Sequence, residues 1–402
     1  MVHQTISTSS ARASRASSRI NSMTRLVKAG ALAIVGMLAA CGSAPPLPAE
    51  SLPAPPPAAG AGFPEDAAPL PPPITTAKSR WIPVRWSDLP GFDEDALHEA
   101  WNAWLRSCER PAAPWTTLCP QVRRLSIASA QEQRAWLAQA LQPYRVEPLQ
   151  PGDPGLLTAY YEPVLEASRV ASPAYPVPLY RPPAGLGQRK PWYSRQEIDT
   201  LPEARAALRG REIAWLADPV DALVLQIQGS GRLRITESDG RQTLVRLAYA
   251  GTNDHPYRSV GGWLLQQGAV RDASWPGIKS WVRANPKRGT EMLWANPRFV
   301  VFREETLTDL DAAFGPRGAQ GVPLTPGRSI AVDRESIPYG TPVWLASPGP
   351  QARLQRLVLA QDTGSAIVGA VRADYFVGWG EPAGELAGRL KQPLRLWALW
   401  PR

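Results

Sequence analysis

Short β-rich runs separated by turn residues constrain the fold of this chain more than any other feature. From Leu156 onward, aliphatic and β-branched runs alternate with Gly, Pro and Asn. Regularly spaced short strands are typical of barrels and sandwiches. A helical stretch over Val260–Gln267 and Ile278–Ala284 interrupts them. The sequence therefore predicts a mainly β fold, with strands at Leu223–Gln228, Leu233–Thr236, Thr243–Tyr249, Phe299–Arg303, Ser329–Val332, Pro342–Leu345, Leu357–Gln361 and Leu394–Leu399.

Two amphipathic helices are predicted ahead of the β-rich part, at Phe92–Ser107 and Gln131–Leu141. In the first, Leu and Trp residues recur at helical spacing, which indicates one buried face. The second follows Ser129, with Glu132 three residues later, and this pattern is typical of a capping box. Both helices are expected to be structural.

The first forty residues have the features of an export signal. From Met23, a basic start is followed by about a dozen apolar or small residues, and the stretch ends in Leu-Ala-Ala-Cys at Cys41. This ending resembles the lipobox of bacterial lipoproteins, in which the Cys is lipidated and becomes the mature N-terminus. The sequence predicts a removed signal over 1–40, with its start at Met1 or Met23, and a lipid anchor on Cys41. An ordinary cleaved signal with an incidental Cys is the alternative.

The residues after Cys41 predict a location and a tether. Gly42 and Ser43 follow the Cys, and no Asp does, so the lipoprotein interpretation places the protein at the bacterial outer membrane, lipid-anchored and facing the periplasm. Residues 44–73 contain twelve prolines, a composition that cannot bury a core and favours extended polyproline conformations. We therefore expect 41–77 to be a lipidated tether.

The net charge of +9 arises largely at the N-terminus. Residues 1–40 hold five Lys or Arg and no acid, which leaves 39 bases against 35 acids, or +4, for the rest of the chain. Without runs of Lys or Arg, this surplus argues against nucleic acid as a partner. The three His and three Cys are scattered and do not have the spacing of a metal site. No metal and no cofactor is therefore expected.

Cys108 and Cys119 are the two cysteines beyond the predicted anchor. They lie eleven positions apart, with Pro111 and Pro114 between them. In an exported protein this arrangement favours a local disulfide. Two buried free cysteines are the alternative.

Polar and aromatic residues gather in the segment Gly155–Pro163, which contains Thr158, Tyr160, Tyr161 and Glu162. Adjacent tyrosines offer flat faces and hydroxyls, which sugars use for stacking and hydrogen bonding. A strand with one Tyr in the core and one at the surface explains the segment equally well. Two donor-rich loops follow, and their candidate substrate-binding residues are Gln228, Gly229, Ser230, Tyr249, Tyr257 and Arg258.

Three aspartates lie near predicted strand ends in the last third of the chain: Asp333, Asp362 and Asp374. A single Asp beside Gly usually satisfies the amides of a turn. Three such carboxylates within 42 residues are harder to explain in that way. They are therefore candidates for acid–base chemistry or substrate binding.

Together these segments resemble the membrane-bound lytic murein transglycosylase A family. The likeness covers Gly155 to Gly380 and the lipobox. Its motifs here are Thr-x-Tyr-Tyr-Glu-Pro, Gln-Gly-Ser-Gly, Tyr-Ala-Gly followed by Tyr-Arg-Ser, Asn-Pro-x-Phe-Val-Val-Phe, and Asp-Thr-Gly-Ser-Ala-Ile with Arg-Ala-Asp. The last third is similar to the three-aspartate domain of that family, on the three aspartates named above. Ser365 stands where many members have Gly.

The resemblance implies a double-psi β-barrel catalytic domain from 78–162 and 303–402, with a second, smaller β-barrel inserted at 163–302. Helices would flank the barrels, and the groove between them would take peptidoglycan glycan strands. The implied reaction cleaves the β-1,4 bond between N-acetylmuramic acid and N-acetylglucosamine without water and forms 1,6-anhydromuramoyl ends. Asp374 would be the catalytic acid, with Asp362 beside it and Asp333 binding substrate.

Two other classes of function stay open. The run Leu-Val-Leu-Ala-Gln-Asp-Thr-Gly-Ser is similar to the signature of aspartic peptidases, whose chemistry needs two carboxylates that share a proton. Only one such Asp-Thr-Gly tripeptide occurs in this chain. A non-catalytic lipoprotein could instead hold peptidoglycan on Trp and Tyr surfaces. The sequence indicates no particular protein partner.

Overall fold

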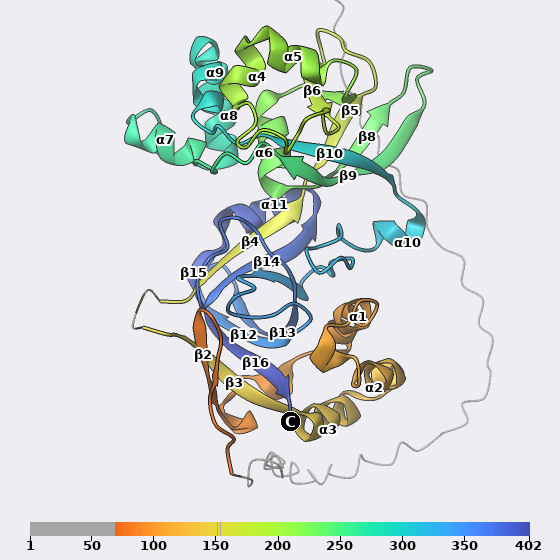
Figure 1. Ribbon diagram of the computed structural model, residues 1–402, viewed down its shortest axis with the longest axis vertical. Helices are drawn as coiled ribbons and strands as arrows, with labels where there is room; N and C mark the ends of the chain where they lie inside the picture. The colour runs from red at the N-terminus through yellow and green to blue at the C-terminus, as the bar shows by residue number, and fades with distance from the viewer. Residues whose placement is uncertain (1–68, 151, 153) are drawn as a thin grey trace, which may run out of the picture. The chain divides into compact units, whose positions relative to one another are not determined.

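Strands of this chain form two sheets, which we call sheet A and sheet B (Figure 1). The computed structural model describes residues 69–402, apart from 151 and 153. Sheet A has 10 strands in the order β1-β2-β3-β16-β12-β13-β11-β14-β4-β15: β1 (Ile74–Thr75), β2 (Ser79–Pro83), β3 (Leu141–Pro148), β4 (Leu156–Glu162), β11 (Ser329–Val332), β12 (Pro342–Pro348), β13 (Arg353–Asp362), β14 (Arg372–Trp379), β15 (Lys391–Pro393) and β16 (Arg395–Pro401). Sheet B has 6 strands in the order β10-β9-β8-β5-β7-β6: β5 (Val164–Ser168), β6 (Val177–Tyr180), β7 (Glu212–Leu216), β8 (Gly231–Thr236), β9 (Gln242–Thr252) and β10 (Val300–Thr306).

Sheet A curls into a nearly closed barrel. β11 pairs in parallel with β13, and β14 pairs in parallel with β4. All other neighbouring strands of sheet A pair antiparallel. The edge strand β15 lies against β12, where Ser347 Oγ donates to Pro393 O at 2.5 Å and Gln392 Nε2 donates to Ser347 Oγ at 2.7 Å. Closure of this kind leaves few unpaired strand edges.

Sheet B curls in the same way around an apolar interior that includes Leu233, Leu247 and Phe302. Its two edge strands are β6 and β10. The ring of Tyr180, at the end of β6, lies 6.3 Å from that of Phe299, just before β10. Together with the flanking helices, the two curled sheets confirm the predicted mainly β fold. Because β10 stays paired with β9 as far as Thr306, sheet B extends beyond the boundary expected at 302.

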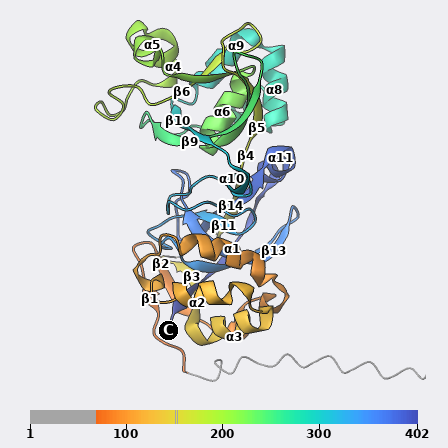
Figure 2. The ribbon, with the colours of Figure 1, turned by 90° about the vertical axis from the view of Figure 1, so that its right-hand side faces the viewer.

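Helices flank both sheets: α1 (Leu97–Ser107), α2 (Cys119–Arg124), α3 (Ala130–Ala140), α4 (Arg195–Thr200), α5 (Pro202–Leu208), α6 (Pro219–Gln228), α7 (Val260–Gln266), α8 (Trp275–Ala284), α9 (Pro286–Trp294), α10 (Asp309–Ala312) and α11 (Gly380–Arg389). In Figures 1 and 2, α1, α2 and α3 gather beside β2 and β3. The predicted capping box is present, since Ser129 and Glu132 cap each other's backbone amides at the start of α3. The first predicted helix starts later than expected, at Leu97, because a 3-10 turn occupies Phe92–Glu94.

Tryptophans fill the space between α1–α3 and sheet A. The ring centroids of Trp104 lie 6.1 Å from those of Trp115 and 5.5 Å from those of Trp136. Trp344 of β12 and Trp397 of β16 are buried in the same cluster. Large aromatic side chains bury more apolar area than other residues, so this layer holds the three helices on the barrel.

A buried ion pair fastens the same helices to sheet A. Arg328 is 2% exposed and donates to both carboxylate oxygens of Asp95 at 2.8 Å. Asp95 Oδ2 also accepts from the backbone N–H of Leu357 in β13, at 3.0 Å. The segment that leads into α1 is thereby fixed to the strand that ends at Asp362.

The predicted strand Leu223–Gln228 is wrong, because these residues belong to helix α6. Asp218 caps the helix by accepting from Val220 N–H, Pro219 is its first residue, and Gly229 ends it in the left-handed conformation, at φ 80°. These are strong start and stop signals. The run is apolar on nearly all sides because α6 is buried, and periodicity alone cannot distinguish such a helix from a buried strand.

The signal, Cys41 and most of the tether lie outside the described residues. The end of the expected tether does not: Ile74 and Thr75 form β1, which pairs with β2 in sheet A. Of the helices between residues 69 and 402, none has the length and apolar character to cross a membrane.

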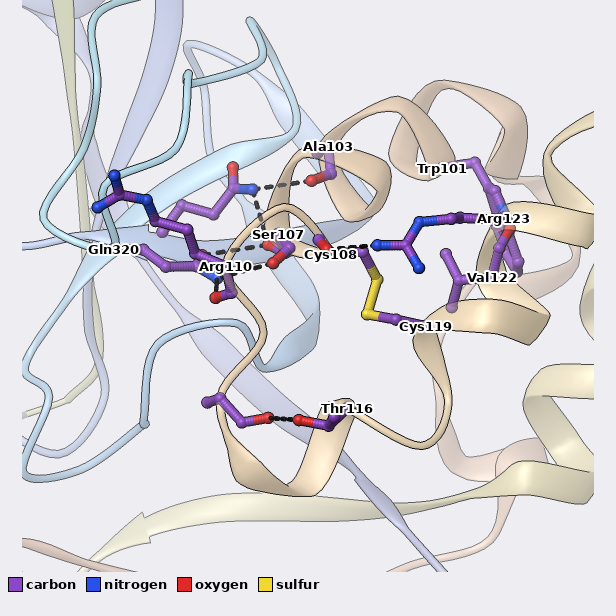
Figure 3. Close-up of a disulfide and its surroundings, with 12 residues drawn as sticks. Trp101, Ala103, Ser107, Cys108, Arg110, Thr116, Cys119, Val122, Arg123 and Gln320 are labelled. Carbon is purple, nitrogen blue, oxygen red and sulfur yellow. Dashed lines mark hydrogen bonds between the residues drawn. A yellow bond between two sulfur atoms is a disulfide. The ribbon is translucent and has the colours of Figure 1, made fainter.

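A disulfide joins Cys108 and Cys119, as the sequence predicted (Figure 3). It connects the C-terminal end of α1 to the start of α2, and both cysteines are buried in the tryptophan cluster. Arg123 Nη2 donates to the backbone carbonyl of Cys108 at 2.7 Å. The loop between the cysteines is therefore held at both ends.

Replacing both cysteines by Ala should lower the free energy of unfolding by about 3 kcal/mol, the entropy model's value for a loop of this length, since the bridged residues are 11 apart. Urea unfolding of the double variant would measure the loss. The wild-type protein under reducing conditions is the control, and it should unfold at the same urea concentration as the variant. Equal midpoints for the variant and the oxidised wild type would contradict a stabilising disulfide.

Candidate active site

A cleft of about 850 Å³ is lined by residues of both sheets and the segments attached to them. Its floor comes from sheet A and contains Thr158, Tyr160, Asp362 and Asp374. The opposite wall comes from the end of α6, from β9 and from the segment before β10. A cleft of this volume lies within the usual range for ligand sites.

Asp374 lies on the floor of the cleft beside Thr158. The parallel register of β14 and β4 places these two residues opposite each other, and the Thr158 hydroxyl donates to Asp374 Oδ1. Arg372 is two residues earlier on β14, so its side chain leaves the same face of the strand. Its Nη2 donates to Thr158 Oγ1 at 2.8 Å. Three side chains thus form a hydrogen-bonded chain that ends on the carboxylate.

Opposing effects set the protonation of Asp374. Burial in the cleft floor raises its pKa, whereas the Thr158 hydrogen bond and the charge of Arg372 lower it. The balance leaves the pKa above the ordinary value for Asp. A carboxyl of this kind keeps its proton at a higher pH than a solvated Asp, as a general acid must.

Asp362 lies across one strand from Asp374. Both pair with Ala331 of β11, one from β13 and the other from β14, and cross-strand neighbours share a face of the sheet. Tyr160 O–H donates to Asp362 Oδ2 at 2.8 Å, and the Ala319 amide donates to Oδ1 at 2.9 Å. Burial raises the pKa of Asp362, and the negative charge of Asp374 raises it further. Two carboxyls with raised pKa values therefore face one cleft.

The opposite wall presents amide and phenol groups. Gln228, Gly229 and Ser230 line it at the C-terminal end of α6. Tyr249 and Tyr257 line it too, and are 46% and 38% exposed. These two rings therefore have free surface on which a ligand could stack.

Glu162 does not reach the cleft, which corrects its assignment as a substrate-binding residue. It is 0% exposed. Its carboxylate accepts from Arg232 Nε at 3.1 Å and from Arg246 Nε at 2.8 Å. Because a buried charge must be paired, the structure assigns Glu162 to an internal ion-pair cluster that connects β4 with β8 and β9.

Three further candidates also lie outside the cleft lining. Asp333 is 6% exposed and accepts from Lys78 Nζ at 2.9 Å and from the amide of Gly369 at 2.9 Å, so it is a turn residue. Tyr161 packs against the apolar cluster around α6 to α9. Arg258 is exposed and does not line the cleft. The structure therefore does not support direct substrate contacts by these three residues.

Sequence reasoning missed several cleft residues. Arg372 was visible in the Arg-Ala-Asp motif, two positions before Asp374, and this spacing places both on one face of a strand. The Ala319 amide, which binds Asp362, had no sequence signal, since any residue except proline offers an N–H. Arg110 and Arg298 come from segments distant in sequence, and only the fold brings them to the cleft.

Known proteins are similar to this chain in segments that contribute to both sheets. The family model described as the MltA specific insert domain matches residues 156–303, and that of the 3D domain matches 328–400. The chain is 33% identical over 257 residues to the membrane-bound lytic murein transglycosylase A of Vibrio cholerae, covering 61% of this chain and 65% of that protein. The structure of the lytic transglycosylase LtgG of Burkholderia pseudomallei is 44% identical, with TM-score 0.57, and the match covers 83% of this chain and 99% of that one. The chain belongs to the membrane-bound lytic murein transglycosylase A family.

Another family member provides a ligand-bound structure. It is the structure of Escherichia coli MltA with bound chitohexaose, whose sequence is 26% identical to this chain. The two structures superpose with TM-score 0.64, and the match covers 80% of this chain and 94% of that chain. Against the curated Vibrio cholerae relative, however, the aligned part spans slightly less than two thirds of that protein's length. Family membership here therefore rests on both matched domains and on the similarity to solved structures.

Proposed function

We propose that this protein is a lytic transglycosylase that cleaves peptidoglycan glycan strands. The observation that carries the proposal is Asp374, a carboxyl with a raised pKa on the floor of a sugar-sized cleft. Its surroundings support the same role, because Thr158 and Arg372 orient it and limit the rise of its pKa. The E. coli relative with bound chitohexaose supports a glycan in the cleft.

In the proposed reaction one carboxyl acts twice. Asp374 first donates its proton to the glycosidic oxygen between N-acetylmuramic acid and N-acetylglucosamine. The resulting carboxylate then takes the proton of the muramoyl C6 hydroxyl while that oxygen bonds to C1. The products are an N-acetylglucosamine end with a free hydroxyl and a 1,6-anhydromuramoyl end. Asp374 regains its proton, and no water is consumed.

The remaining cleft residues have supporting roles in this proposal. Asp362, held by Tyr160 and the Ala319 amide, acts as the neighbouring carboxyl that orients the sugar. Substrate would contact the other predicted residues that line the cleft, which are Thr158, Tyr160, Gln228, Gly229, Ser230, Tyr249 and Tyr257.

Domain roles and membrane attachment follow the same proposal. Sheet A, which apart from β1 lies within 78–162 and 303–402, would be the double-psi catalytic domain. Sheet B, within 163–302 and the end of β10, would be the inserted domain. A lipid on Cys41 would attach the protein to the outer membrane from the periplasmic side. The name of the Vibrio cholerae relative, which includes "membrane-bound", supports attachment to a membrane.

Incubation with purified sacculi tests the proposed function. Mass spectrometry of the released products should show anhydromuramoyl ends. Hydrolysis would instead give reducing ends that are heavier by about 18 Da, the mass of the water taken up. Sedimentation with the sacculi without soluble products would indicate a binding protein, and released peptides would indicate a peptidase.

Replacing Arg372 by Met should move the alkaline limb of the activity profile to higher pH. A general acid works only while protonated, so activity falls as the pH rises through the pKa of Asp374. Arg372 lowers that pKa, and its removal therefore raises it. The pH dependence of kcat/KM measures the shift. The control is Arg395→Met, since Arg395 is exposed on β16 and lies outside the cleft lining. If the alkaline limb of Arg372→Met stayed at its wild-type pH, Arg372 would not influence the pKa of the catalytic acid.

A further inference from the structure

The cleft carries more positive charge than the proposed reaction uses. Five arginines line it, against two aspartates. An oligomer of N-acetylglucosamine is uncharged and offers these cations no partner. The five arginines are Arg110, Arg298, Arg303, Arg317 and Arg372.

Two of the five already interact with side chains of the cleft or its rim. Arg303 forms an ion pair with Glu305 at 2.9 Å, and Arg372 is occupied by Thr158 and the nearby Asp374. Arg110 and Arg317 form no ion pair with a carboxylate in the described part of the chain, and the charge of Arg317 acts on the exposed Asp311, whose pKa it lowers. Both side chains are exposed at the cleft. They are therefore available to an anionic ligand.

The guanidinium groups of Arg110 and Arg317 converge on Gly321. Arg317 Nη1 donates to the Gly321 carbonyl at 3.2 Å. A Cβ added at Gly321 would lie 2.7 Å from Arg110 Nη1, and this residue also has a φ of +83°. The positive φ favours glycine at this position, and the end of the Arg110 side chain lies close to it. Two neighbouring cations repel each other unless an anion lies between them.

Both arginines stand on segments that are held in place. Arg110 lies within the loop closed by the disulfide, and Gln320 Nε2 donates to its carbonyl at 3.2 Å (Figure 3). Ser107 Oγ donates to Gln320 Oε1 at 3.1 Å. The preceding residue, Ala319, donates its backbone N–H to Asp362 Oδ1. The backbone at and near both arginines is therefore held relative to the cleft floor before any ligand binds, so that only the two side chains have to be ordered on binding.

We propose that Arg110 and Arg317 bind a carboxylate on the muramoyl side chain of the substrate. Guanidinium groups match carboxylates in geometry and charge. Within the proposed function, on which this inference rests, only the muramoyl units carry such groups. The carboxylate comes either from the acidic peptide stem or, where the stem is absent, from the lactyl group to which stems attach. The pair would make the protein prefer muramoyl glycans over neutral chitin-type glycans.

Equilibrium binding to three glycans tests this proposal. The ligands are soluble glycan strands with peptide stems, the same strands after amidase treatment, and the uncharged hexamer of N-acetylglucosamine. All proteins carry Asp374→Asn, so that no strand is cut. Arg110→Gln/Arg317→Gln is compared with the control Arg395→Gln, which removes an exposed arginine outside the cleft lining.

The double variant should lower the affinity for charged relative to neutral glycan about tenfold or more, as expected for lost charge-assisted hydrogen bonds. A loss on stemmed strands alone assigns the carboxylate to the stem. A loss on amidase-treated strands alone assigns it to the lactyl group, and equal losses on both show that the pair binds either carboxylate. Arg110→Lys/Arg317→Lys should recover part of the preference. An unchanged affinity ratio overturns the proposal. Because binding is measured without cleavage, this result is independent of the product analysis that tests lytic activity.

Discussion

Asp374→Asn should lower the rate at which anhydromuramoyl ends form by about 10³-fold, within the range for loss of a general acid–base group. The amide can neither donate the proton to the glycosidic oxygen nor accept one from the C6 hydroxyl. It keeps the size of the side chain and an oxygen that accepts from Thr158, so the cleft should stay intact. Product analysis on sacculi measures the rate. The matched control is Asp309→Asn, which removes an exposed carboxylate on α10.

The same substitution should stabilise the fold at neutral pH, and the direction of this change follows from the raised pKa of Asp374. Because burial raises the pKa of Asp374 in the folded state, the folded protein binds this proton more tightly than the unfolded chain does. Its contribution to the free energy of unfolding therefore falls as the pH rises from the unfolded toward the folded pKa. At neutral pH, Asp374→Asn should unfold at a higher temperature than the wild type, and the difference should vanish below about pH 3.9, the pKa of a solvated Asp. A folded variant with full activity would remove Asp374 from the proposed role.

Glu162→Gln should lower the free energy of unfolding by about 3–5 kcal/mol, the usual cost of removing one partner from a buried ion pair. The carboxylate lies between Arg232 and Arg246, and the side chains of both arginines are only 6% exposed. A neutral amide would leave two buried cations without a counter-charge. Arg232 is also fixed over the ring of Trp379, at 3.7 Å from its centroid. Both arginines have to stay buried after the substitution, and urea unfolding would measure the resulting loss.

Glu166→Gln provides a matched control, because Glu166 lies on β5, four residues after Glu162, and also pairs with an arginine of β8. Glu166 pairs with Arg234 at 2.6 Å, but their side chains are 55% and 53% exposed. An exposed pair contributes about 0–1 kcal/mol, so this variant should unfold close to the wild type. If both variants shifted the urea midpoint equally, the cluster around Glu162 would have no special role. If Glu162→Gln folded with wild-type stability but failed to bind glycan, Glu162 would be a substrate-binding residue after all, contrary to its buried position.

Local signals predicted much of the secondary structure. The strand Ser329–Val332 and the capping box at Ser129 match the structure, because both depend on neighbouring residues. Residues Leu223–Gln228, the last part of helix α6 (Pro219–Gln228), are predicted as a strand, although the caps of this helix are visible in the sequence at Asp218 and Gly229. Its apolar residues are buried on nearly all sides by tertiary packing, so they show no helical periodicity.

For the candidate site, too, the sequence motifs identify some of the residues, and the tertiary structure decides which of them reach the cleft. Motifs in the sequence were enough to select Asp374, Asp362 and Thr158, which the structure brings to one cleft floor. The same motifs also selected Glu162 and Asp333, whose carboxylates are turned inward to internal partners. A motif records which residues are present, but whether a carboxylate meets substrate or an arginine depends on what packs against it.

By itself, the sequence determined the family resemblance, the mainly β character and the pairing of Cys108 with Cys119, since these follow from residue types and short spacings. Tertiary structure alone decided that Asp362 and Asp374 flank Ala331 on one face of the barrel. It also decided that Arg110 and Arg317, 207 positions apart in sequence, meet at Gly321. Strand register and loop closure bring these residues together, and both arise from packing across the whole barrel rather than from any local run of the chain.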